Sequence, residues 1–165
     1  MISNHKMRLV LKTGDIFLVH LPDHEKRYFQ YIGNDQVQLN SDLIRVFIKT
    51  DNTCISLEDI VGSSIDFHAH VSIRLGFKMS CWSKIGNAPI AAAAAPLFRT
   101  SDDYGNPEVK NSSKWSVWYP NEERVYVGKL PLEYQSAEIG VVVAPMFIVE
   151  RITKGKYNFF YPGYD

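Results

Sequence analysis

Short runs of apolar and β-branched residues, separated by polar turns, form the pattern of the first part of the chain. Three such runs lie at 16–21, 28–32 and 43–48, and turn residues such as Pro22 and Gly33 stand between them. Short connections of this kind join antiparallel strands, because parallel neighbours need a long crossover. The pattern therefore predicts an antiparallel meander.

The next stretch carries a helix signal followed by strand signals. Ser56 is suited to cap a helix, Asp59 follows it three residues later, and Gly62 is a typical stop, so a helix of one or two turns is expected at 56–62. Residues 66–73 alternate strictly between polar and apolar, which predicts a strand. A glycine turn and a further aromatic strand are expected after it, with the strand at 77–82.

The second half of the chain opens with a composition break. Residues 86–113 are rich in proline and small polar side chains, which predicts a long mid-chain loop. Beyond it, the pattern predicts a hairpin, one helical turn and a final hairpin: 114–119 with 124–128, then 131–135, then 146–152 with 157–160. The predicted fold is a single β-rich α+β domain over 1–165, an antiparallel meander or partly closed barrel with one or two short helices.

Composition narrows the class of protein. A chain of 165 residues that is 45% apolar and 22% charged has the balance of one ordinary globular domain. Eighteen basic residues against eighteen acidic ones leave no net charge, which argues against nucleic-acid binding by general basicity. No apolar stretch approaches the roughly 20 residues that span a bilayer. Cys54 and Cys81 are isolated from each other, which favours buried thiols in a reducing, cytoplasmic compartment.

Asp66, His68 and His70 form the sharpest chemical pattern. They stand at every second position, so all three side chains lie on one face of the predicted strand. Two imidazoles and a carboxylate could hold a zinc ion with one open position, as a small metal-dependent hydrolase requires. The alternative is a half-buried strand whose polar face meets solvent. Since no second cluster of ligands occurs elsewhere, these residues remain candidates and no cofactor is expected.

Other catalytic patterns are weak. Cys81 stands beside Trp82 without a glycine-rich turn that could form an oxyanion hole, so it is interpreted as a small buried residue. The motifs GxSxG, GxGxxG and the P-loop do not occur. Trp115 and Trp118 stand three apart and are expected on opposite faces of a strand, one in the core and the other exposed or under the long loop. None of these patterns makes a convincing catalytic set.

Two acidic segments with aromatic neighbours are candidates for contact with a protein partner. An acidic loop that carries an aromatic side chain combines steering charge with an anchor. The alternative for each segment is a solvated loop that keeps the protein soluble. The candidate partner-binding residues are Asp102, Asp103 and Tyr104 in the long loop, and Tyr119, Glu122 and Glu123 at the hairpin tip.

Several short segments of the sequence together resemble the immunity protein 26 family. The similarity opens at 12–17, a Gly-Asp-aromatic strand start, and continues over nearly the whole chain. The other similar segments are 28–32, 38–41, 44–47, Asp66-Phe67 with His70, 115–118, 148–150 and Thr153 with 155–157.

The resemblance implies an α+β protein of bacterial toxin systems that binds and neutralises a cognate toxin domain encoded nearby. The absence of a long apolar stretch and of net positive charge predicts no membrane and no nucleic-acid partner, and the oligomeric state stays open. The resemblance, together with the lack of a convincing catalytic set, favours a binding protein over an enzyme. The same family is sometimes labelled phosphotriesterase-like, which would imply the hydrolase alternative, but no catalytic motif of the family can be placed on this chain. A single-stranded nucleic-acid binder would need a local basic groove, which the sequence does not reveal.

Overall fold

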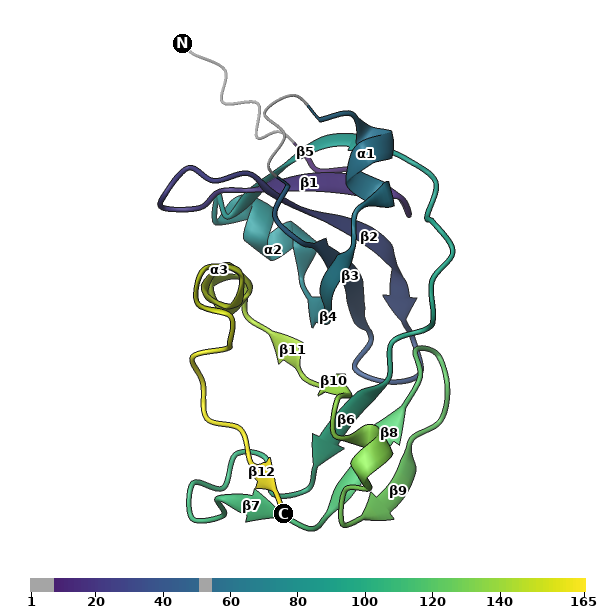
Figure 1. The fold of residues 1–165 in the computed structure, drawn as a ribbon, viewed down its shortest axis with the longest axis vertical. Helices are drawn as coiled ribbons and strands as arrows, with labels where there is room; N and C mark the ends of the chain where they lie inside the picture. Colours follow the sequence, from purple (N-terminus) through teal and green to yellow (C-terminus); the bar gives the residue numbers. More distant parts are fainter. Residues whose placement is uncertain (1–7, 51–54) are drawn as a thin grey trace.

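The computed structural model describes residues 8–50 and 55–165, and its largest sheet has six strands (Figure 1). The strand order is β11-β4-β3-β2-β1-β5. β1 to β4 pair antiparallel in sequence order, so the predicted meander is confirmed. β5 adds antiparallel to β1 and β11 adds parallel to β4, and the strands of the described residues close no barrel. The bounds are β1 Asp15–Val19, β2 Arg27–Asp35, β3 Ser41–Phe47, β4 Ile65–Val71, β5 Trp82–Asn87 and β11 Val142–Val143.

A second sheet of four strands has the order β10-β6-β8-β9. Its hairpin β8–β9 is the one predicted, and the expected helical turn follows as η1. The prediction of one long loop at 86–113 is wrong, because β6 within it pairs with both β8 and β10, and β7 pairs with the C-terminal β12. The bounds are β6 Phe98–Ser101, β7 Asn111–Ser112, β8 Trp115–Trp118, β9 Val125–Gly128, η1 Leu132–Tyr134, β10 Glu138–Ile139 and β12 Gly163–Tyr164.

The helix α1, Leu57–Gly62, forms where the sequence predicts it. The Ser56 side chain accepts the Asp59 amide, and the Asp59 carboxylate accepts the Ser56 amide in return. This reciprocal capping satisfies two amides that a helix start otherwise leaves unpaired.

The helix α2, Ile73–Lys78, replaces the expected start of a strand at residue 77. Ser72 caps it by accepting the Leu75 amide, and Gly76 lies inside it against the Trp82 ring. A helix residue without a side chain is required there, so Gly76 marks close packing rather than a turn. The strand begins only at Trp82.

The helix α3, Pro145–Lys154, replaces the final hairpin. Pro145 occupies the first turn, and Gly155 ends the helix with a left-handed φ of 78°. Ile148 and Ile152, one turn apart, are buried on the same side. Counting the described residues, the protein therefore has three α-helices and η1, more than the one or two short helices expected.

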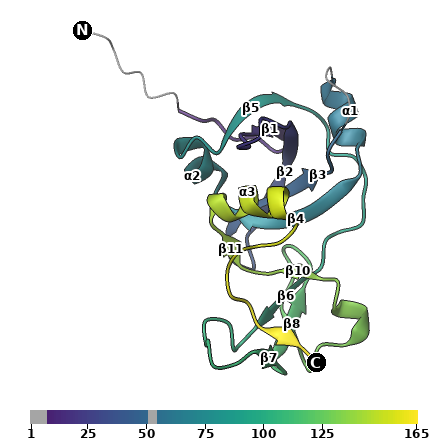
Figure 2. The same ribbon diagram turned by 60° about the vertical axis from the view of Figure 1, so that its left-hand side comes forward.

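Helices cover both faces of the six-stranded sheet (Figure 2). Ile148 and Ile152 of α3 pack with Phe67 and other residues on one face, and Ile60 of α1 packs on the other face. The two sheets meet through a separate apolar cluster that includes Leu43, Phe98 and Trp118. The segment 138–143 crosses between them, with β10 in the second sheet and β11 in the first.

Candidate functional site

A buried carboxylate joins the two sheets. Asp35, the last residue of β2, is 0% exposed and accepts four hydrogen bonds, each of 3.0 Å. Its Oδ1 receives the amides of Gln38 and Asn121, and its Oδ2 receives Trp118 Nε1 and His70 Nε2. These five residues are called the Asp35 network. They fix the β8–β9 hairpin to the end of β2.

The charges of the Asp35 network are set by burial and by hydrogen bonds. Burial raises the pKa of the Asp35 carboxyl, but the four hydrogen bonds outweigh it and hold that pKa below its usual value. Burial lowers the pKa of His70 despite the attraction of Asp35. His70 is therefore neutral at pH 7 and donates from Nε2, which leaves buried Nδ1 as an acceptor with no partner in the described part of the chain.

His68 is bonded in a different way. Its Nε2 accepts Arg45 Nε over 3.3 Å, and Arg45 also donates to the Ala91 carbonyl over 3.0 Å. Burial, helped by the Arg45 charge, lowers the pKa of His68 to about 4. The lone pair that a metal would need is therefore directed at a guanidinium group.

Asp66 completes the set of predicted metal ligands, and it too has its own partner. Its carboxylate accepts Arg27 Nη2 over 2.6 Å, while Arg27 also donates to the Phe47 carbonyl. Each of Asp66, His68 and His70 is thus held by a separate protein group. Over residues 8–50 and 55–165, no three His, Cys, Asp or Glu side chains lie close enough to share a metal ion.

The predicted contacts at the hairpin tip, defined as residues 119–124, are exposed on a fixed backbone. Asn121 adopts a φ of 64°, donates its amide to Asp35 and accepts the Gln36 amide over 2.8 Å. The Glu122 carbonyl accepts Gln38 Nε2 over 3.4 Å. The tip is therefore held at several points to the turn after β2. Tyr119, Glu122 and Glu123 all have exposed side chains.

The predicted contacts in the acidic loop, residues 102–104, are only partly available. Asp103 Oδ2 accepts Ser112 Oγ over 2.7 Å, and Asp103 Oδ1 lies 3.5 Å from Lys114 Nζ. This carboxylate thus holds the loop together. Asp102 is exposed, and Tyr104 is 47% exposed although its ring packs against Tyr161 with centroids 5.4 Å apart.

The acidic loop and the hairpin tip lie at opposite ends of the second sheet (Figure 1). The register of β6 and β8 pairs Phe98 with Trp118 at one end and Ser101 with Trp115 at the other. The loop follows Ser101 and the tip follows Trp118, so the structure does not bring the two predicted clusters together.

The remaining candidates of the sequence take structural positions. Trp115 and Trp118 were expected on opposite faces, one in the core and the other exposed or under the long loop; both are buried, in separate apolar clusters. Cys81 is a half-buried free thiol whose pKa is raised by burial, and Cys54 lies outside the described residues. The Asp35 network was not predicted, because a lone aspartate in a turn gives no sign of the tryptophan and histidine that reach it.

Comparison with known protein families decides the identity. A model of immunity protein 26 matches residues 12–108, more than half of the chain. The chain belongs to the immunity protein 26 family. The match covers Asp35, His70 and the acidic loop, while the hairpin tip and α3 lie beyond it. Searches of curated proteins and of solved structures found no match to this immunity protein 26 family member.

The described part of the chain contains no helix of the length and hydropathy that crossing a bilayer requires.

Proposed function

We propose that this chain is an immunity protein that binds a cognate bacterial toxin domain in the cytoplasm and neutralises it. The observation that carries the proposal is the family match over residues 12–108. Because the described catalytic candidates are occupied by protein partners, inhibition by binding is the simplest activity for this chain. Among residues 8–50 and 55–165, no contact favours the hydrolase alternative.

We place the toxin-binding surface at the hairpin tip. A side chain contributes most to affinity when little freedom is lost on binding, and the Asp35 network fixes the backbone of this tip. Tyr119 is 42% exposed, and Tyr126 on the neighbouring β9 is 63% exposed. Tyrosine is enriched among the side chains that contribute most to binding at protein interfaces, and charged side chains around such an anchor steer the encounter of the partners. Glu122 and Glu123 supply that charge and favour a basic surface on the toxin.

The acidic loop is the competing location for the interface. Asp102 and Tyr104 are exposed there, but Asp103 is already used within the loop and Tyr104 packs on Tyr161. Since the two locations are at opposite ends of the sheet, mutations at each end separate them.

Growth protection tests the function itself. The toxin domain encoded next to this gene is expressed from an inducible promoter, with or without this chain. We expect growth to stop with the toxin alone and to resume with the intact chain. Asp35→Asn serves as the control: it is expected to protect less well, because it destabilises the fold that holds the hairpin tip. Failure of the intact, folded chain to protect would contradict the proposal.

A further inference from the structure

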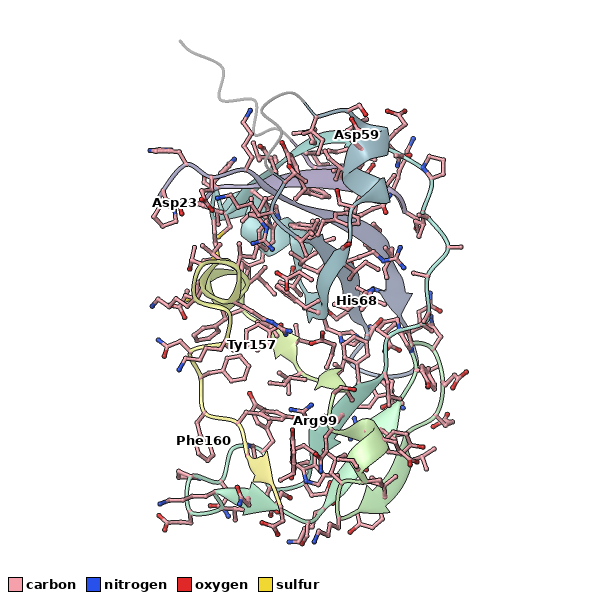
Figure 3. The ribbon with its side chains drawn as sticks, in the orientation of Figure 1. Asp23, Asp59, His68, Arg99, Tyr157 and Phe160 are labelled. Atoms are coloured by element: carbon pink, nitrogen blue, oxygen red, sulfur yellow. The ribbon has the colours of Figure 1, made fainter. Side chains whose placement is uncertain are left out.

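A cavity of about 400 Å³ lies beneath α3, where the C-terminal segment passes β6 and β10. In Figure 3, Arg99 comes from the second sheet and Tyr157 from the C-terminal segment, and both lie along this region. Its volume is in the range of small-molecule sites, roughly 300–1,000 Å³. Its polar lining consists mainly of Arg99, Glu138, Arg151, Lys156, Tyr157 and Tyr161.

The cavity carries an excess of positive charge in a protein that has no net charge. Arg151 is paired with Glu138, with Nη1–Oε2 and Nη2–Oε1 distances of 2.9 and 3.5 Å. Glu138 is the one carboxylate among the lining residues, so the charges of Arg99 and Lys156 are not balanced within the lining. The lining therefore carries about two positive charges more than negative ones, which a dianion would balance.

Arg99 is held in place before any ligand arrives. Its Nη1 donates to the carbonyls of Gln135, over 3.1 Å, and Ala137. Its guanidinium carbon lies 5.7 Å from the centre of the Trp115 ring and 5.4 Å from that of Tyr164. These contacts involve carbonyls and rings, and no carboxylate of the described residues lies within ion-pair distance of Arg99, although the charge of Glu138 acts on it from farther away. Buried Arg99 Nε has no hydrogen-bond partner in the described part of the chain.

Aromatic side chains form the wall of the cavity on the side of the C-terminal segment. Tyr157, Phe159 and Tyr161 stand at every second position and all line it, while Phe160 between them is 49% exposed. The Tyr161 hydroxyl donates to the Arg99 carbonyl over 3.0 Å and ties this wall to β6. The site thus combines a fixed arginine and an exposed lysine with flat apolar surface, which suits a phosphate group attached to a small organic body.

We propose that this cavity binds a small phosphate monoester as its dianion, with the phosphate held by Arg99 and Lys156. At pH 7 a phosphate monoester carries about −1.5 to −2 charges, which matches the excess of the lining. An arginine fork is suited to phosphate oxygens, and Arg99 lines the cavity with its Nε donor unpaired in the described part of the chain. The site is separate from the hairpin tip and does not depend on the proposed function.

Titration of the full chain with phenyl phosphate tests the proposal, with phenol as the probe that lacks the phosphate. We expect saturable binding with a Kd on the order of 1 mM or tighter at low salt, and none with phenol. The NMR resonance of Arg99 Nε–H is expected to shift downfield as it gains an acceptor. Equal binding of phenol, or a titration of phenyl phosphate that does not saturate, would overturn the site.

A matched pair of charge removals keeps the test independent of folding. Lys156→Gln removes a lining charge, whereas Lys154→Gln removes an exposed charge two residues away that does not line the cavity. We expect about fivefold weaker phenyl phosphate binding in Lys156→Gln and little change in Lys154→Gln. Equal weakening by both would mean general charge attraction and would overturn the proposal.

Discussion

Trp118 of the second sheet donates its indole N–H to the Asp35 carboxylate of the first sheet over 3.0 Å. The bond is fully buried, and the same oxygen accepts His70 Nε2. The Asp35 carboxylate stabilises the fold because it is paired with all four donors. If it is removed, the donors that stay buried lose their acceptor, and each one costs free energy. The position of one sheet relative to the other, and with it the hairpin tip, therefore depends on Asp35.

Asp35→Asn tests this dependence on stability. The amide can still accept two hydrogen bonds through its oxygen, but its NH₂ group would face the indole N–H of Trp118, which can only donate. We expect the free energy of unfolding to fall by about 3 kcal/mol. Urea denaturation followed by tryptophan fluorescence and by circular dichroism measures it, and the two curves are expected to coincide because both sheets share the buried contacts.

Asp102→Asn is the control for that experiment, since Asp102 is exposed and outside the Asp35 network. Its effect is expected to stay within about 0.5 kcal/mol. If Asp35→Asn were as harmless as Asp102→Asn, the carboxylate would not join the sheets as described.

The pH dependence of stability should expose His68. The unfolded chain takes up a proton on this histidine near pH 6.5, whereas the folded chain does so only at about 4. As the pH falls between these values, protons bind the unfolded state first, so the free energy of unfolding decreases by up to about 3 kcal/mol. The lowered pKa of Asp35 adds a further loss, but only as the pH falls below about 3.8.

Urea denaturation at a series of pH values measures this, with His68→Gln compared with the exposed His24→Gln. The slope between pH 6.5 and 4 should diminish in His68→Gln and persist in His24→Gln. An unchanged slope in His68→Gln would show that burial does not keep this imidazole neutral.

Two helix glycines give a matched test of packing. A Cβ on Gly76 would overlap the Trp82 ring, while a Cβ on Gly62 would meet nothing within 4 Å. We expect Gly76→Ala to lower the free energy of unfolding by about 1–3 kcal/mol, because a full core cannot take the added methyl. Gly62→Ala should be neutral or raise it by about 0.4–1 kcal/mol. Thermal denaturation of both variants measures the two changes in stability. If Gly62→Ala were the more destabilising of the two, this description of α2 would be refuted.

The sequence predicts those parts of the fold that local signals determine. The Ser56–Asp59 capping box and the β8–β9 hairpin each depend on a few neighbouring residues, and both form as expected. The prediction of a strand at 146–152 is wrong, because an apolar run of this length with branched residues suits a strand and a helix equally. Pro145 before it and Gly155 after it were the signals of a helix.

Long-range contacts account for what the sequence could not show. β6 lies in a segment rich in proline and polar residues, and it becomes a strand because β8 and β10 flank it. Asp66, His68 and His70 do alternate on a strand, but the sequence gives no sign that Arg27, Arg45 and Asp35 reach them. The sequence predicts each candidate partner residue on its own. Only the pairing register of β6 and β8 shows that the two clusters lie at opposite ends of the sheet.

The location of the toxin-binding surface is tested by two tyrosine truncations. If the hairpin tip binds the toxin, Tyr119→Ala should weaken the complex by at least about tenfold, as loss of an aromatic anchor does. Tyr104→Ala, at the other end of the sheet, should change the affinity little. Surface plasmon resonance with immobilised toxin domain measures both. Weakening by Tyr104→Ala alone would move the interface to the acidic loop.

Isothermal titration calorimetry of the purified chain with the purified toxin domain encoded beside its gene tests the central claim most directly. We expect a saturable complex of defined stoichiometry that forms without any added metal or cofactor, together with loss of toxin activity at the same molar ratio. No heat of binding and undiminished toxin activity, with a chain shown to be folded, would contradict the assignment of this protein as the immunity partner of that toxin.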